Sequence, residues 1–209
     1  FNLLYFVLAF AGVACMHIGT NIINDYFDHK SGNDDVNMEF LRPFSGGARM
    51  LQLGILTPLE TLVGALMLFG AGSLIGLYLT LKLGLVVLLL GLTGIISGLL
   101  YTAPVVNWAG RGVGELLVGL NFGILVTLGA YFIQAQSLSA EAVWASLPVA
   151  ILISAVLWIN EIPDYTADVR TGKKTLVARI GRRKAAQFYT YILMSSYVFL
   201  LAGVVFAKL

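Results

Sequence analysis

Hydrophobic residues fill six long runs of the chain, and polar residues gather in the connections between them. The runs cover residues 3–23, 58–80, 83–101, 113–135, 141–160 and 184–207. A helix needs about 20 apolar residues to cross the hydrocarbon core of a bilayer. A spanning segment must also satisfy its backbone groups internally, and the alternating pattern of a membrane β-barrel is absent. The pattern therefore predicts an all-α, polytopic bundle with six transmembrane helices.

The connections between these runs differ in length and charge. Short turns are predicted near Lys82 and at 136–139. Longer loops are predicted at about 24–57, 102–112 and 161–183. All but two of the 13 Lys and Arg residues, Lys82 and Lys208, lie in these loops or at the adjacent Lys184. Because Lys and Arg are enriched in cytoplasmic loops, we expect the long loops to face the cytoplasm of a prokaryotic cell membrane.

The composition supports a membrane protein and excludes an ordinary soluble domain. Hydrophobic residues make up 58% of the chain and charged residues 11%, whereas a soluble domain carries about 25% charged residues. The net charge of +2 does not indicate a nucleic-acid partner. The chain begins inside an apolar run without Met, so we interpret residues 1–209 as a single domain from a longer protein, truncated at both ends. The oligomeric state stays open.

The first polar cluster, NDYFDHKSGND (24–34), follows the first apolar run. With Asn21, which lies three residues before this stretch, the amides and acids of the cluster include Asn24, Asp25, Asp28 and Asp34. Residues three and four apart share one face of a helix, so Asn21, Asp25 and Asp28 are predicted to form a stripe. Gly32 indicates that the helix ends there, and Asp34 is expected to fold back toward the stripe.

The second cluster, NEIPDYTADVRTGKKTL (160–176), repeats this arrangement. Asn160, Asp164 and Asp168 are spaced by four residues and therefore share one helical face. Arg170, Lys173 and Lys174 follow within six residues of Asp168. The chain thus places amides and carboxylates twice at the same end of a membrane helix.

Paired stripes of this kind suit a metal-bound diphosphate. Carboxylate and amide oxygens are hard ligands, and Mg²⁺ is usually held by one or two carboxylates together with substrate phosphates. Two facing stripes are therefore predicted to hold Mg²⁺ bridging a diphosphate, with nearby Arg and Lys binding its remaining charge. The alternative is that the charged residues simply mark cytoplasmic loops. A single cluster would favour that alternative, but two clusters of like spacing do not.

These residues carry a resemblance to a known family. The pair NDYFD and DYTAD resembles the two aspartate-rich motifs of the UbiA superfamily of intramembrane prenyltransferases. The longer stretch NDYFDHKSGND is similar to the form of the first motif in the branch that prenylates 1,4-dihydroxy-2-naphthoate in menaquinone synthesis. Three further stretches are similar: SGGARMLQLGILTP (45–58), LLYTAPVVNWAGRGVGELLVGLNFG (99–123) and TGKKTLVARIGRRKA (171–185). The resemblance implies nine helices around a central cavity, of which this chain would hold the second to the seventh.

The resemblance also implies an activity and roles for individual residues. The activity is Mg²⁺-dependent transfer of an isoprenyl group from an isoprenyl diphosphate to an aromatic acceptor. The implied metal ligands are Asp25, Asp28, Asp34, Asp164 and Asp168. Residues expected to bind substrate are Asn24, Asn160, Arg170, Lys173, Arg42 and Arg49. Catalytic roles fall to Asp28, Asp164, Asp168, Arg111 and Tyr101.

One departure from the family pattern concerns the diphosphate. Relatives often carry a lysine after the Tyr-Thr pair, here Tyr101 and Thr102, whereas this chain offers only Asn107 and Arg111. Either Arg111 replaces the lysine or the diphosphate is bound differently. Arg42 and Arg49 are expected to hold an aromatic acid or close a lid, and interfacial anchoring is the alternative for both.

Other activities remain as alternatives. Ether-lipid, chlorophyll, haem or ubiquinone prenyltransferases and terpene cyclases share the implied metal site and differ in the acceptor pocket. A cation transporter is a different class, since intramembrane acids mark ion pathways. A transporter predicts acids near the middle of the membrane, whereas here they cluster at one face.

Overall fold

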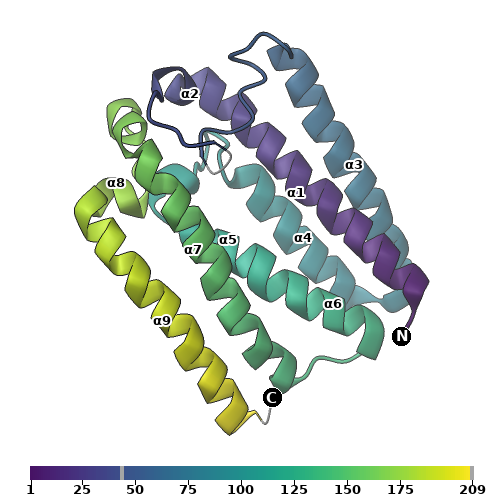
Figure 1. Cartoon of the computed structure of the whole chain (residues 1–209). Coiled ribbons are helices and arrows are strands. Elements are labelled where there is room, and N and C mark those ends of the chain that lie inside the picture. The colour runs from purple at the N-terminus through teal and green to yellow at the C-terminus, as the bar shows by residue number, and fades with distance from the viewer. Residues whose placement is uncertain (43–44, 208–209) are drawn as a thin grey trace.

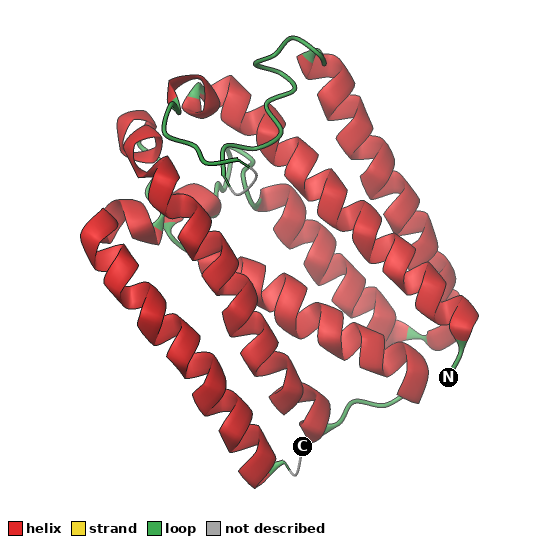
Figure 2. Ribbon diagram, in the orientation of Figure 1, coloured by secondary structure: helices red, strands yellow, loops and turns green. Residues whose placement is uncertain are grey.

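The computed structural model describes residues 1–42 and 45–207, and these residues form helices joined by loops and turns (Figures 1 and 2). Lys208 lies outside the described residues. The α-helices are α1 (Leu3–Ser31), α2 (Asn33–Val36), α3 (Pro58–Leu83), α4 (Leu85–Leu100), α5 (Gly114–Val118), α6 (Val126–Ala135), α7 (Ala140–Thr171), α8 (Leu176–Ile180) and α9 (Arg182–Phe206). A 3₁₀ turn, η1 (Ala109–Arg111), and a π-helix, η2 (Gly119–Leu125), complete the set. The described residues contain no strand, which confirms the predicted all-α class.

Five of the predicted apolar runs form helices long enough to cross a bilayer. These are α1, α3, the continuous segment Gly114–Ala135, α7 and α9. The remaining run forms α4, which has only 16 residues and is about 24 Å long at 1.5 Å per residue. A hydrocarbon core is about 30 Å thick. The predicted helix at 83–101 is therefore present, but it is shorter than a full span because it begins after Gly84 and ends at Leu100.

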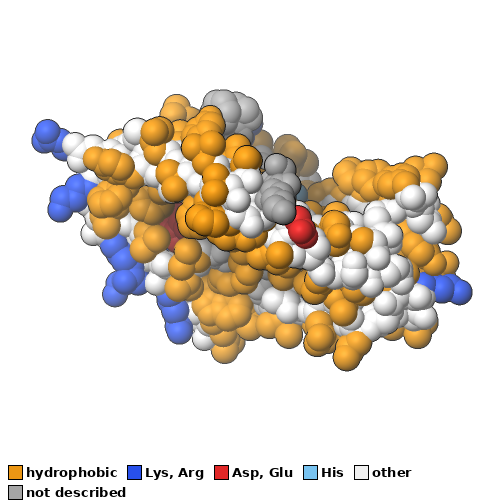
Figure 3. All heavy atoms as spheres, turned by 90° about the horizontal axis from the view of Figure 1, so that it is seen from below, with side chains coloured by type: hydrophobic (Ala, Val, Ile, Leu, Met, Phe, Trp, Pro, Cys, Tyr) orange, Lys and Arg blue, Asp and Glu red, His pale blue; other side chains and the backbone are white. Residues whose placement is uncertain are grey.

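The surface of the bundle matches a lipid environment. Large hydrophobic side chains are exposed along every long helix, including Phe10, Leu74 and Tyr191, each about 70% exposed. The face shown in Figure 3 is covered largely by hydrophobic side chains, and Lys and Arg gather mainly at one edge. An apolar surface of this extent is unfavourable in water and favourable in lipid.

The long connections lie together at one end of the bundle. Residues 37–42, 45–57, 101–113 and 172–175 are at the end marked by α2 and α8 in Figure 1, and the short turns are at the opposite end, near the N-terminus. The helices that carry the acidic clusters extend farther than the loop boundaries in the sequence suggested. Helix α1 continues to Ser31 and α7 to Thr171. The clusters therefore lie on the last turns of helices rather than in loops.

Two local cores hold the helices together. Ile23 of α1 packs with Ala65 and Phe69 of α3. Trp158 of α7 packs with Val177 and Ala185, and its indole N–H donates to the Ala185 carbonyl at 2.9 Å. These two cores leave α1 and α7 with their polar ends free to meet α2.

Helix η2 packs very closely against α7 through two glycines. A Cβ on Gly119 would lie 2.2 Å from Ser154 Oγ, and a Cβ on Gly123 would lie 2.2 Å from Ala150 Cα. Small residues four apart allow membrane helices to approach closely, which strengthens their packing. The glycines at 119 and 123 therefore set the distance between η2 and α7.

The substitution Gly123→Ala tests this close contact. Because the added methyl group would meet backbone rather than a flexible side chain, the helices must separate, at a cost of roughly 1–3 kcal/mol. The thermal unfolding temperature of the purified protein in detergent should fall by several degrees. Gly94→Ala is the matched control, since a Cβ at Gly94 meets no atom within 4 Å. Equal unfolding temperatures for the two variants would contradict this packing.

Candidate active site

The candidate site lies where the ends of α1 and α7 meet α2 (Figure 1). Both helices end in the same way. Gly32 follows α1 with φ 75° and Gly172 follows α7 with φ 76°, and each glycine N–H donates to carbonyls of the last turn. This left-handed cap stops a helix and favours glycine. Asp28 and Asp168 each lie four residues before their capping glycine, so both reach the same end of the bundle.

Lys173 connects the two aspartate clusters. Its Nζ donates a hydrogen bond to Asp28 Oδ2 at 3.0 Å, and the two side chains are only 19% and 13% exposed. Burial lowers the pKa of Lys173, but the carboxylates of Asp28 and Asp168 outweigh burial and raise this pKa above its ordinary value. Lys173 is therefore a permanent cation between the first cluster and the second.

Amide side chains orient the carboxylates of both helices. Asn24 Nδ2 donates to Asp28 Oδ2 at 3.0 Å within α1. The second cluster receives its amides from the segment that follows α1. The contacts are Asn33 Nδ2 to Asp168 Oδ1 at 3.2 Å and Asn37 Nδ2 to Asp164 Oδ1 at 2.8 Å. The two clusters are thus joined by hydrogen bonds as well as by Lys173.

Asp34 and Asp25 lie beside the same group of acids. Asp34 is 8% exposed, and its Oδ2 accepts a hydrogen bond from Gln52 at 3.4 Å. Burial, and after it the charges of Asp28 and Asp25, raises the pKa of Asp34 to about 7. The expectation that Asp34 folds back toward the stripe is therefore confirmed.

The loop at 45–49 covers Asp25. Gly47 has a φ of 63°, and a Cβ on it would lie 2.7 Å from Asp25 Oδ1. A side chain at this position would therefore be strained and would also displace the carboxylate. The backbone of the SGGAR segment can approach Asp25 only because residue 47 is glycine.

The donor set fits a cation that is shared with a phosphate ligand. Within residues 1–42 and 45–207, no three His, Cys, Asp or Glu side chains converge closely enough to form a metal site alone. The available donors are carboxylate and amide oxygens, which suit Mg²⁺, and Mg²⁺ is usually bound by one or two carboxylates plus phosphates. Five aspartates also outnumber the single buried lysine. The residues present therefore fit Mg²⁺ with a bound phosphate group.

The arginines predicted to bind substrate occupy different positions. Arg49 donates from Nη1 to the carbonyls of Asp34 and Asn37, at 3.1 and 3.3 Å, and it lies 4.5 Å from the Phe40 ring centroid. Arg42 is exposed, with its guanidinium 5.9 Å from the same ring. Arg49 thus holds the loop in place, whereas Arg42 lies at its surface.

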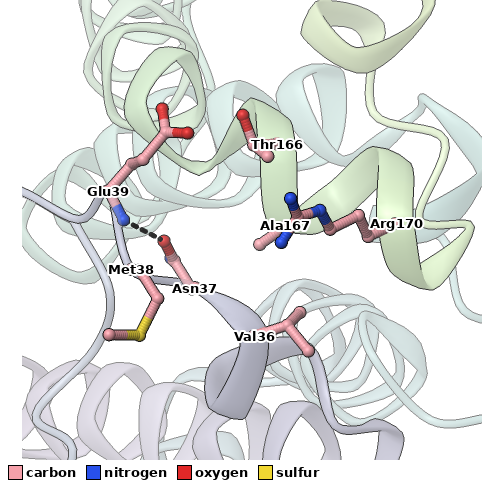
Figure 4. A pocket seen from close by; sticks show the side chains of 7 residues that line it. All are labelled: Val36, Asn37, Met38, Glu39, Thr166, Ala167 and Arg170. Carbon is pink, nitrogen blue, oxygen red and sulfur yellow. Dashed lines mark hydrogen bonds between the residues drawn. The ribbon is translucent and has the colours of Figure 1, made fainter.

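Arg170 lines a small pocket on the outer side of α2. The pocket has a volume of about 180 Å³ and is lined by Val36, Asn37, Met38, Glu39, Thr166, Ala167 and Arg170 (Figure 4). Asn37 belongs both to this lining and to the contact with Asp164. Arg170 is exposed and shares this pocket with Asn37, which bonds to Asp164.

The remaining predicted residues lie near the site or at its edge. Arg111 is exposed in η1, and its carbonyl accepts a hydrogen bond from Arg179 Nη2 at 2.7 Å. Tyr101 follows α4, and burial, together with the charge of Glu161, raises its pKa above the ordinary value. Asn160 is half-buried on α7. The structure groups Tyr101 with the acids and leaves the Arg111 side chain facing outward.

Several contributing residues were not among those singled out in the sequence. Asn33 and Asn37 are four apart after Gly32, a spacing that would have been the only signal for them. Glu115 and Glu161 are 3% and 8% exposed, and their carboxyl groups lie within hydrogen-bonding reach of each other. Glu115 Oε1 also accepts from the Leu176 N–H at 2.7 Å, which holds the segment after Lys173 in place.

Comparison with known proteins identifies the family. The profile of the UbiA prenyltransferase family matches residues 1–209. The chain belongs to the UbiA prenyltransferase family. No solved structure gives a significant match.

Curated prenyltransferases are similar to this chain over most of its length. It is 29% identical over 204 residues to a 1,4-dihydroxy-2-naphthoate octaprenyltransferase of Bacillus subtilis (strain 168), covering 98% of this chain and 64% of that protein. The corresponding enzyme of Escherichia coli (strain K12) is 30% identical over 204 residues, covering 95% and 64%. A 2-carboxy-1,4-naphthoquinone phytyltransferase of Synechocystis sp. is 27% identical over 184 residues, covering 88% and 57%. The chain thus spans somewhat less than two thirds of the length of these UbiA relatives.

The substitution Lys173→Met tests the electrostatic role of the lysine. Without the ammonium, the buried carboxylates repel one another with no cation between them, which should cost roughly 1.5–3 kcal/mol. The metal-free protein in detergent should therefore unfold several degrees lower than the wild type. Lys174→Met is the control, because Lys174 is exposed and bonds through its main chain to Gly110. If both variants unfolded at the wild-type temperature, Lys173 would not hold the clusters together.

Proposed function

We propose that this chain forms the catalytic core of a Mg²⁺-dependent prenyltransferase. The reaction transfers an isoprenyl group from an isoprenyl diphosphate to an aromatic acceptor such as 1,4-dihydroxy-2-naphthoate. The observation that carries this proposal is that the two aspartate clusters meet at one end of the bundle, where Lys173 bonds to Asp28 of α1 and the amides of Asn33 and Asn37 bond to Asp168 and Asp164 of α7. Family membership and the names of the relatives support the choice of reaction.

The excess of carboxylates is the reason to assign divalent cations to the site. Lys173 can neutralise only one of the five carboxylates, and the raised pKa of Asp34 indicates that ionising them all is unfavourable without further cations. Asp28 and Asp34 would hold Mg²⁺ from the first cluster, and Asp164 and Asp168 from the second, with Asp25 supporting. When bound, Mg²⁺ would supply Lewis acidity that stabilises the negative charge of the leaving diphosphate.

Basic side chains around the acids would position the diphosphate. Lys173 lies at the centre and can donate to a phosphate oxygen in addition to Asp28. Arg170 lies on the neighbouring turn of α7, and Arg111 lies at the edge. Guanidinium groups bind phosphate oxygens through a planar, bidentate fork. Asn24 and Asn160 would order the carboxylates or waters on the two helices.

The apolar part of the site would protect the allylic cation that forms when the diphosphate leaves. Such a cation must be kept from water, and the aspartates lie at the end of helices whose remaining length is apolar. Tyr101 places an aromatic ring next to the acids, where its π face can stabilise positive charge. Because its pKa is raised, the Tyr101 hydroxyl keeps its proton. Arg42 and Arg49 would bind the aromatic acceptor or close the loop over it.

The relatives favour a naphthoate acceptor for quinone synthesis. Two of the similar proteins are named for 1,4-dihydroxy-2-naphthoate and a third for 2-carboxy-1,4-naphthoquinone. We therefore place the enzyme in the prokaryotic cell membrane in menaquinone or related quinone synthesis. The bias of Lys and Arg toward one end supports a cytoplasmic position for the site.

The first test concerns metal dependence. The purified protein should transfer a radiolabelled prenyl group from its diphosphate to 1,4-dihydroxy-2-naphthoate in the presence of Mg²⁺ and lose this activity in EDTA. Asp164→Ala should abolish turnover while the protein stays folded. Asp35→Ala is the control, since Asp35 is exposed on the same side of the bundle. Full turnover in chelator, or more than a tenth of wild-type activity in Asp164→Ala, would rule out the proposed metal role.

The second test concerns Arg111. If its guanidinium binds the diphosphate, Arg111→Ala should weaken binding by roughly 1.5–3 kcal/mol, which is the cost of losing a hydrogen bond to a charged group. The KM for the diphosphate should therefore rise by about 10- to 150-fold, and Arg111→Lys should recover part of the loss. Arg183→Ala serves as a control for exposed charge at this end of the bundle. A KM within twofold of wild type with kcat intact would reduce Arg111 to an anchor at the membrane surface.

A further inference from the structure

Two asparagines and two aspartates form a matched double contact between α2 and α7. Asn33 and Asn37 are four residues apart, and so are Asp164 and Asp168. Asn33 bonds to Asp168 at 3.2 Å and Asn37 to Asp164 at 2.8 Å. The order of the partners is reversed, so the two segments run in opposite directions. Residues four apart share a helical face, which allows both contacts to form together.

The orientation of each amide is determined by its hydrogen-bond partners. The Glu39 N–H, which can only donate, points to Asn37 Oδ1 at 3.3 Å (Figure 4). The NH₂ group of Asn37 must therefore face Asp164. For Asn33 the orientation follows from Asp168, because a carboxylate can only accept and must therefore face the NH₂ group, and this places Asn33 Oδ1 2.8 Å from Thr171 Oγ1. The two asparagine residues are 5% and 3% exposed, so neither amide can rotate freely.

Neutral amides serve every aspartate that we assign as a main metal ligand. Asn24 bonds to Asp28, Gln52 to Asp34, Asn37 to Asp164 and Asn33 to Asp168. An amide N–H fixes one carboxylate oxygen without cancelling its charge, whereas an ammonium or guanidinium would compete with a metal ion. Asp28 also accepts from the Lys173 ammonium, but the hydrogen bonds to Asp164 and Asp168 within the described residues come from neutral groups. Hydrogen bonds from outside the ligand set orient ligands, and their loss typically lowers metal affinity by 10- to 100-fold.

We infer that Asn33 and Asn37 are positioning residues that orient the second aspartate cluster for divalent metal. Each asparagine holds Oδ1 of its aspartate, and the Oδ2 of Asp168 accepts a hydrogen bond from Thr175 Oγ1 at 3.4 Å. The asparagines would thereby fix the rotation of both carboxylates for a metal ion. The segment after the first cluster thereby completes the metal site of the second. This inference rests on the proposed function and assigns the two asparagines a role in it.

A purely structural role for the asparagines makes a different prediction. If they only attach the 33–52 segment to α7, their loss should lower the stability of the metal-free protein and leave its metal affinity unchanged. Metal affinity measured on folded protein therefore separates the two roles. Binding of Mn²⁺ alone can be followed by the loss of its free EPR signal, which does not depend on turnover.

The experiment titrates Mn²⁺ into the wild-type protein and into Asn33→Ala, Asn37→Ala and Met38→Ala in detergent. We expect Mn²⁺ affinity to fall by about 10- to 100-fold in each asparagine variant. Met38→Ala is the matched control, because Met38 is 80% exposed on the same segment, and it should bind as the wild type does. Unfolding temperatures of the metal-free variants confirm that each remains folded.

A double-mutant cycle makes the assignment specific. If Asn37 acts through Asp164, Asn37→Ala should have no further effect on Mn²⁺ affinity in the Asp164→Ala background. It should keep its effect in the Asp28→Ala background, since Asp28 belongs to the other cluster. Additive effects of Asn37→Ala and Asp164→Ala would overturn the inference.

The outcomes also separate this inference from the proposed function. If the wild-type protein binds Mn²⁺ and the asparagine variants bind it equally well, the inference is wrong and the metal-dependent transferase stands. If the wild-type protein shows no saturable Mn²⁺ binding, the inference is wrong, and the proposed function is then decided by whether turnover requires Mg²⁺. If the alanine variants lose affinity, and serine variants of the same asparagines retain part of it because Ser keeps a shorter donor, the positioning role is supported.

Discussion

At one end of the apolar bundle, carboxylate groups outnumber the buried cations, and the rest of the structure depends on this excess of acidic groups. Five aspartates from two helices and the segment after the first helix lie close enough for their charges to affect one another, and Lys173 is the buried cation between them. A group of this kind is tolerated near a membrane only if cations compensate it. The amide hydrogen bonds, the covering loop and the aligned helix ends all keep these acids together, and none of them removes the excess negative charge. The architecture therefore maintains a site that is incomplete without a positively charged ligand.

The bundle supplies rigid positions for these acids. Glycine caps end α1 and α7 at equivalent distances from Asp28 and Asp168, and Gly119 and Gly123 bring η2 directly against α7. A π-helix is uncommon and is often found at functional sites. Here it lies below the acids, and its Phe122 ring packs 4.5 Å from the His17 ring of α1. The helices that hold the acids are thus fixed to each other through the interior as well as at the end.

Sequence patterns predicted the helices and the paired clusters because both depend on local spacing. The stripes of Asp25 and Asp28 and of Asp164 and Asp168 follow from helical periodicity, and Gly32 marked the end of α1 correctly. The stripe of Asn160, Asp164 and Asp168 also predicted that the helix continues past Glu161, as α7 does. The short length of α4 was not predicted, because the apolar residues at its ends resemble the rest of a membrane-spanning run. The partners of the second cluster could not be predicted at all. Asn33 and Asn37 contact residues more than 120 positions away, and no local pattern encodes such a contact.

This long separation has a consequence for the order in which the protein forms. The contacts of Asn33, Asn37 and Lys173 join residues 135, 127 and 145 positions apart. Contacts between distant residues form late, because the ends of a long chain segment must first be brought together. During synthesis, α1 and the first cluster are made long before α7. Until then, Asp28 has no Lys173 to bond with, and Asn33 and Asn37 lack the aspartates that they contact in the folded protein. The candidate site therefore cannot form until α7 and Lys173 have been made, so its assembly depends on elements far apart in the chain.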